Sequence, residues 1–142
     1  MRLVKHLLEG KDGAIHAVAP EAAVLEAIRA MADKHVGALL VMRGSELVGI
    51  VSERDYARKV ILKGRSSADT PVSDIMSAPV ISVAPGDSAH RCMRLMTERH
   101  IRHLAVVEDT RVVGVLSIGD LVKAVIDDQA EQLEQLQRYI VG

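Results

Sequence analysis

The sequence of 142 residues predicts a mixed α/β (α+β) fold built from two pseudo-symmetric repeats that pack through their sheets. The first observation is an internal repeat, because residues 49–55 return 65 residues later as residues 114–120. The second is the order of apolar patterns, which reads in each copy as strand, helix, strand, strand, helix. The third is size: one such unit is too small to bury its sheet face alone, whereas two units can cover each other.

The repeats divide the chain into four stretches. The first repeat is assigned to residues 1–65 and the second to residues 72–128, with a polar linker at 66–71 between them. From residue 15 to residue 55 the first copy aligns with the second without a gap. Residues 129–142 form a C-terminal helical extension that has no counterpart after the first copy.

The first repeat begins with a strand and a helix. Ile15 to Val18 form an apolar run of strand length that meets Pro20, and Pro20 with Glu21 is suited to the first turn of a helix. This helix is expected to end near His35. Its apolar residues recur at helical spacing and give it one buried face: Val24, Ile28 and Met31.

A hairpin and a second helix complete the repeat. Residues 38–42 form a continuous apolar strand, a tight turn follows at 43–46, and residues 47–51 return as the second strand. Because the strand at 38–42 is apolar on both faces, we expect both faces to be covered. The next helix follows Ser52 and is expected to end at Gly64.

The C-terminal helix of the second repeat continues past the length of its counterpart. Its apolar positions are spaced 3, 4, 3 and 4, as in a short coiled-coil seam: Ile126, Gln129, Leu133, Leu136 and Ile140. Fewer than three heptads leave two interpretations open, a seam between two copies of the chain or a helix that packs back on its own subunit.

Each copy of the recurring motif places a serine and an aspartate three residues apart where a strand runs into a helix. The pairs are Ser52 with Asp55 and Ser117 with Asp120. A helix N-terminus attracts phosphate through unpaired N–H groups and a partial positive charge, and an aspartate can accept both hydroxyls of a ribose. The same spacing matches a capping box, in which the pair serves only its own helix. Recurrence at a fixed offset favours the ligand site.

Composition excludes several classes of function. The net charge is −1 and the only aromatic residues are Tyr56 and Tyr139, so the basic field and stacking platforms of nucleic-acid binders are missing. No apolar run is long enough to cross a bilayer, and the single cysteine, Cys92, suits a reducing compartment and a place in the core. We therefore expect a cytoplasmic protein without nucleic-acid or membrane partners.

No catalytic site and no metal site are predicted. Enzymes need a nucleophile, an acid–base pair or a metal, and the sequence assembles none of these. His100 and His103 have a spacing seen in metal sites, but zinc is not expected without a nearby cysteine or carboxylate cluster. His35 and His100 are equivalent by repeat, and both are expected to lie at helix C-termini, where an imidazolium is favourable.

The duplicated unit resembles a tandem pair of cystathionine-β-synthase (CBS) domains, also called a Bateman module. The resemblance runs from Val4 to about Ile126. It rests on the recurring motif together with residues 52–59, 74–76 and 100–107. Many family members have proline where this chain has Leu40 and Ala105, a departure that concerns the strand edges rather than the ligand site.

The resemblance implies two clefts between the repeats, each able to take an adenosine-containing ligand. By position, Asp55 and Asp120 would hold the ribose hydroxyls, and Ser52 and Ser117 would meet phosphate beside the helix N-termini. The beginnings of the first strands would flank the adenine through backbone groups, at Ile15, His16, Val80 and Ile81.

The two clefts are expected to differ. Arg54 precedes Asp55, whereas Gly119 occupies the matching place in the second copy, and Arg102 with His103 replaces a glycine and an alanine of the first. Related nucleotide sensors place basic residues near this strand position against the phosphate. The hypothesis is that Arg54, Arg102 and His103 gather at one phosphate-rich cleft near Asp55; the alternative for Arg102 and His103 is a solvated strand end.

The implied function is regulation and signal transduction without catalysis or a catalytic cofactor. AMP is the first candidate ligand, with ADP, ATP, NAD or S-adenosylmethionine as alternatives, and binding would shift the population of conformations or assemblies. The resemblance also implies a homodimer and a regulated protein partner of unknown identity. A rival interpretation is a partner-binding adaptor whose nucleotide clefts are vestigial and whose C-terminal helix is the working surface.

Overall fold

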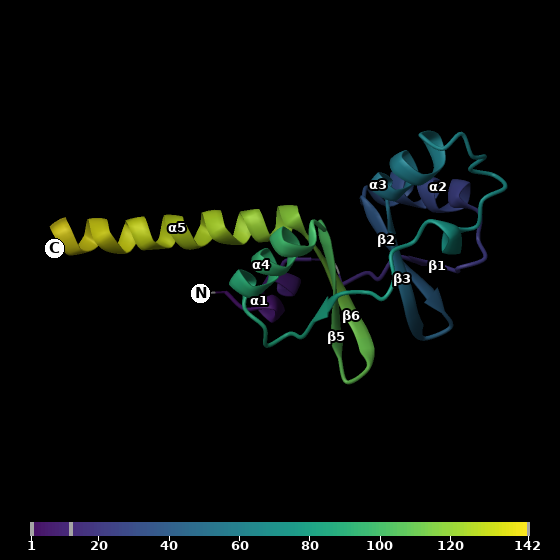
Figure 1. The fold of residues 1–142 in the computed structure, drawn as a ribbon. Coiled ribbons are helices and arrows are strands. Elements are labelled where there is room, and N and C mark those ends of the chain that lie inside the picture. The colour runs from purple at the N-terminus through teal and green to yellow at the C-terminus, as the bar shows by residue number, and fades with distance from the viewer. Residues whose placement is uncertain (1, 12, 142) are drawn as a thin grey trace. The chain divides into compact units, whose positions relative to one another are not determined.

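The computed structural model describes residues 2–11 and 13–141, and its strands and helices follow the predicted order (Figure 1). The chain divides into two compact units. We call Ile15–Ile81 the central unit, and Met1–Ala14 together with Ser82–Gly142 the terminal unit. Each unit holds one three-stranded sheet with helices, which confirms the predicted mixed fold.

The sheet of the central unit has the strand order β1-β2-β3. Its strands are β1 (Ala17–Val18), β2 (Ala38–Arg43) and β3 (Glu46–Ser52). β1 runs parallel to β2, and β3 returns antiparallel to β2 with one irregularity of register between Val41 and Met42. The predicted hairpin is confirmed, and residues 38–41 are all buried, as the apolar run indicated. The predicted first strand is shorter than expected, although the carbonyl of His16 still accepts a hydrogen bond from Leu40 N (3.1 Å).

Helices cover this sheet. They are α2 (Val24–Lys34), α3 (Glu53–Tyr56), a π-helical turn η1 (Ala57–Ile61) and a 3-10 turn η2 (Val72–Asp74). Their apolar side chains share one core with β2 and β3: Val24, Ala27, Met31, Leu39, Val41, Val51, Val60, Val72 and Ile75. The helical turns of α3 and η1 end at Ile61, three residues before the stop predicted at Gly64; Gly64 itself has a φ of 67°, a left-handed conformation that glycine adopts without strain.

The first helix begins later than the sequence indicated. Pro20 with Glu21 was expected to form its first turn, but α2 starts at Val24. The backbone just before α2 instead pairs with the chain around residue 72. Val72 N donates to Ala22 O (2.8 Å), and Ser73 N donates to Pro20 O (2.9 Å). Residues 20 and 21 form a turn, closed by Ala22 N donating to Ala19 O (3.1 Å), and the long-range bonds keep this turn out of α2, which is why the prediction was wrong at this point.

The terminal unit repeats the same plan. Its elements are α1 (Val4–Glu9), β4 (Ser82–Val83), α4 (Ala89–Arg99), β5 (His103–Glu108), β6 (Arg111–Ser117) and α5 (Ile118–Val141). β4 is parallel to β5, and β6 is antiparallel to β5 with the matching irregularity between Val106 and Val107. Cys92 is fully buried in this core, as expected, and burial raises the pKa of its thiol to about 11.

The two compact units do not coincide with the two sequence repeats, because a segment of each repeat packs against the sheet of the other repeat. α1 precedes the first repeat's sheet in the sequence, yet Leu8 packs against Gly114 of β6. In the same way, Met76 packs against Gly49 of β3. A side chain at either glycine would meet these residues at under 3 Å, so the recurring glycines make room for the two segments.

The two helices that precede the hairpins end alike. His35 and His100 adopt the left-handed conformation, with φ values of 55° and 54°. The backbone N–H of His100 donates to Met96 O and that of His35 to Ala32 O and Met31 O, which closes the last turn of each helix. The predicted position of these histidines at helix C-termini is confirmed.

Candidate functional site

The first motif lies where β3 runs into α3. Ser52 caps the helix, since its Oγ accepts a hydrogen bond from Asp55 N (3.2 Å). The carboxylate of Asp55 in turn accepts bonds from Ser52 N (2.9 Å) and Ser52 Oγ (3.0 Å). The local sequence folds this way because a serine and an acid at this spacing satisfy two backbone donors that the helix leaves unpaired.

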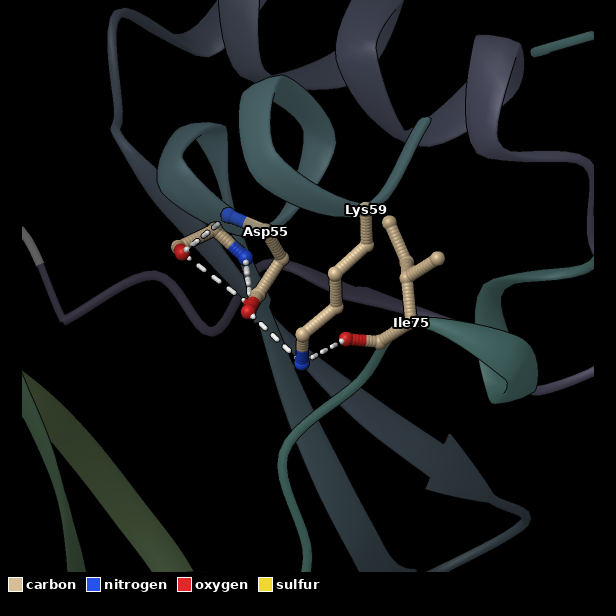
Figure 2. Close-up of polar contacts among 4 residues, drawn as sticks. Asp55, Lys59 and Ile75 are labelled. Atoms are coloured by element: carbon tan, nitrogen blue, oxygen red, sulfur yellow. Dashed lines mark hydrogen bonds and ion pairs between the residues drawn. The ribbon is translucent and has the colours of Figure 1, made fainter. Parts of the chain in front are cut away.

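A lysine completes this arrangement (Figure 2). Lys59 Nζ lies 3.2 Å from Asp55 Oδ1 and also donates a hydrogen bond to Ile75 O (2.9 Å). Lys59 thus connects the carboxylate to the segment that follows η2. The spacing of four residues between Asp55 and Lys59 is the helical ion-pair spacing, a signal that sequence reasoning missed.

The second motif repeats this geometry where β6 runs into α5. Ser117 Oγ accepts from Asp120 N (3.2 Å), and Asp120 Oδ2 accepts from Ser117 N (2.8 Å). Here too a lysine reaches the carboxylate, with Lys11 Nζ 2.8 Å from Asp120 Oδ2. Burial opposes ionisation of Asp120, but the hydrogen bonds from Lys11 and Ser117 outweigh it and hold the pKa of this carboxyl below its usual value.

Arg102 and His103 lie beside this second motif. Ile118 N donates to Arg102 O (2.9 Å), and His103 pairs in register with Ser117 across the hairpin. Burial, with the charge of Lys11 next in size, lowers the pKa of His103 despite the opposing attraction of Asp120. His103 is therefore mainly neutral at pH 7, a hydrogen-bonding group rather than a cation.

The structure divides the predicted ligand residues between the two units. The central unit holds Ser52, Arg54, Asp55, Ile15, His16, Val80 and Ile81. The terminal unit holds Arg102, His103, Ser117 and Asp120. It stays a prediction that Arg102 and His103 lie together with Arg54 near Asp55. Within the described residues, no acidic side chain forms an ion pair with Arg54 or with Arg102.

The predicted adenine-flanking residues are partly accessible. Ile15 is exposed, whereas His16, Val80 and Ile81 are half-buried. The carbonyl of His16 is engaged with Leu40 N, as described above.

In residues 2–11 and 13–141 there is no group of three or more metal-ligating side chains, and no helix there is long and apolar enough to cross a membrane. A shallow hollow of about 330 Å³ lies between α4 and α5, and no residue of either motif lines it. It is lined by His90, Met93, Arg94, Thr97, Glu98 and Val125.

Comparisons with known proteins identify the family of this chain. The family model for the CBS domain matches the chain twice, at residues 13–62 and 72–127. The mitochondrial CBS domain-containing protein CBSX3 of Arabidopsis thaliana is 44% identical over 124 residues, which are 84% of this chain but 60% of that protein. This chain therefore spans about three fifths of that relative.

Solved structures show the same fold. A CBS-domain protein of Burkholderia ambifaria, described as a candidate for signal transduction, is 48% identical with a TM-score of 0.87, covering 90% of this chain and 96% of that one. A CBS domain protein of Pyrobaculum aerophilum, solved in complex with AMP, is 29% identical with a TM-score of 0.78, covering 92% and 99%. These relatives are named as CBS-domain proteins, not as enzymes. The chain belongs to the CBS-domain family and carries a pair of CBS repeats.

Proposed function

We propose that this chain is a non-catalytic regulatory module that binds an adenine nucleotide and changes conformation or assembly in response. The observation that carries the proposal is the recurrence of one arrangement in both units: a serine-capped helix start whose aspartate is paired with a lysine. AMP is the first ligand to test, because a relative with the same fold is complexed with AMP. NAD, ATP, ADP and S-adenosylmethionine are the alternatives.

The lysines decide how a ribose can reach the aspartates. An ionised carboxylate offers about four lone-pair sites. Asp55 Oδ2 already accepts from Ser52 N and Ser52 Oγ, and Lys59 pairs with Oδ1, so a diol that binds through Oδ1 competes with Lys59. The lysine is the contact that can leave without opening the helix start. A displaced ammonium is then available to a phosphate of the same ligand.

The two lysines are held differently, and this predicts an order of binding. Lys59 is anchored twice, by Asp55 and by the carbonyl of Ile75. Lys11 makes its ion pair with Asp120 alone among the described acidic groups. Displacing Lys11 therefore breaks one contact, whereas displacing Lys59 also breaks its hydrogen bond to the carbonyl of Ile75. We therefore expect ligand to engage Asp120 before Asp55.

Isothermal titration calorimetry of the full chain with AMP, ADP, ATP, NAD and S-adenosylmethionine tests the proposal. Asp55→Asn and Asp120→Asn keep an oxygen that can cap the helix but lose the charge. We expect one nucleotide to bind and its affinity to fall at least tenfold in one or both variants. Asp87→Asn is the matched control, since Asp87 also accepts a backbone hydrogen bond, from Ala84 N (2.8 Å), but lies outside both motifs.

A second arm separates the ribose from the phosphate. The same titration is run with an AMP analogue that lacks both ribose hydroxyls and with inorganic phosphate. Loss of affinity for the analogue supports recognition of the diol by aspartate. If folded protein binds none of the nucleotides, or binds them equally well in both asparagine variants, the proposal is wrong and the adaptor interpretation replaces it.

A further inference from the structure

The last turns of α5 carry an apolar surface that no other described part of the chain covers. Figure 1 shows α1 and α4 beside the first half of this helix, whereas its second half extends beyond them. The side chains of Leu133, Leu136 and Ile140 are 60%, 58% and 80% exposed. The interpretation that this helix packs back on its own subunit therefore does not hold for residues 129–141. Scattered apolar residues on a surface are common, but a continuous row along one helix face is not.

The row continues toward the start of the helix with regular spacing. Its members alternate between steps of four and three residues: Val122, Ile126, Gln129, Leu133, Leu136 and Ile140. Val122 and Ile126 are also exposed, at 47% and 58%. We call these six residues the α5 seam. In heptad notation Ile126, Leu133 and Ile140 occupy a positions, and the other three occupy d positions.

Charged side chains lie on the other faces of the helix and find partners within the chain. Arg2 forms ion pairs with Asp128 (2.9 Å) and Glu131 (2.7 Å). Arg138 pairs with Glu134, one helical turn away. Asp128, Glu131, Glu134 and Arg138 thus have partners within the chain, whereas the α5 seam still exposes its apolar side chains to water.

The residues that border the α5 seam favour contact with an identical helix. The e and g positions between residues 130 and 139 are uncharged: Ala130, Gln132, Gln137 and Tyr139. Two copies of this helix therefore meet no like-charge repulsion at these bordering positions. The seam is also its own complement, because in a two-fold pair each layer consists of the same residue from both chains.

We propose that two copies of this chain associate through the α5 seam as a parallel, in-register coiled coil. β-branched Ile126 and Ile140 at a positions with Leu136 at a d position favour two parallel strands. Gln129 supports this orientation, because in register its amide faces the amide of Gln129 in the second copy and can donate and accept. In an antiparallel pair centred on the seam, Gln129 faces Leu133 and its amide loses that partner.

Sedimentation analysis of the full chain over a range of concentrations tests the association. We expect a dimer in the wild-type chain and at least a tenfold higher dissociation constant for Leu133→Gln/Leu136→Gln. The substituted side chains are exposed within one chain, so each unit should remain folded, which circular dichroism checks. Glu131→Gln/Glu134→Gln is the matched control, with two glutamines placed on the same helix outside the seam, and it should remain dimeric.

Cysteine cross-linking tests the orientation. In a parallel pair Gln129→Cys brings two d-position thiols close enough for a disulfide, whereas Gln135→Cys, on an outer face, should stay unlinked under the same mild oxidation. The native Cys92 does not interfere, since it is fully buried. A monomeric wild-type chain, a dimer that survives the seam substitutions, or no disulfide at residue 129 would each overturn the proposal.

Discussion

At the scale of single residues, each of the two motif aspartates both caps a helix and forms an ion pair with a lysine. Asp55 and Asp120 each complete a capping box and each holds a lysine. Capping and ligand binding therefore do not exclude each other. The cap fixes the carboxylate at the helix start, and the lysine pairs with its charge.

His103 should make stability depend on pH. Because its pKa in the folded chain is lowered, the unfolded chain binds a proton first as the pH falls below about 6.5, the ordinary value for histidine. This contribution to the free energy of unfolding is present above pH 6.5 and is lost as the pH falls toward the lowered pKa. Urea unfolding between pH 7.5 and 5 should show a smaller loss for His103→Gln than for wild type.

The cause of that shift can be checked by NMR titration of the imidazole. Lys11 is the largest of the charges that lower the pKa of His103, after burial itself. Lys11→Met should therefore raise the pKa of His103 relative to wild type. A wild-type pKa at or above the ordinary value would contradict both expectations.

At the scale of elements, the two repeats differ in one cap and so provide a matched experiment. Ser88 Oγ accepts from Arg91 N (3.1 Å) at the start of α4, whereas the equivalent residue of α2, Ala23, has no side-chain cap. Ser88→Ala should lower the free energy of unfolding by about 1 kcal/mol. Ala23→Ser should leave it unchanged or raise it by up to about 1 kcal/mol, because the backbone at both positions is extended.

Urea denaturation measures both effects. The midpoint should move in opposite directions in the two variants, or only in Ser88→Ala, with the slope unchanged. A destabilised Ala23→Ser would mean that the contacts of residue 23 with the chain near Pro71 leave no room for a hydroxyl.

At the scale of the whole molecule, the contact of the N-terminal segment with the sheet of the second repeat predicts which residues lose protection when that segment is removed. Removal of residues 1–9 deletes fully buried Val4 and the Leu8 that packs against Gly114. We expect faster amide hydrogen exchange in residues 82–141, although the deletion lies at the other end of the chain. Exchange within residues 15–81 should change less, and loss of protection confined to 15–81 would contradict the observed grouping.

The sequence by itself determined the features that depend on near neighbours. The duplication is visible in the residues themselves. Both hairpins and the serine–aspartate pairs follow from local spacing, because their hydrogen bonds join residues that lie at most one hairpin apart in the sequence. The ion pair of Asp55 with Lys59 is local as well and could have been predicted from its helical spacing.

Only the tertiary structure decided the features that join distant segments. Lys11 reaches Asp120 across 109 residues, and the chain near Val72 holds residues 20–23 out of the helix. No periodicity in the sequence encodes such pairings, since they depend on which segment covers which sheet. The same reason explains why both repeats could be recognised while the exchange of their N-terminal segments could not: the contacts of Leu8 with Gly114 and of Met76 with Gly49 are set by tertiary packing and not by local spacing.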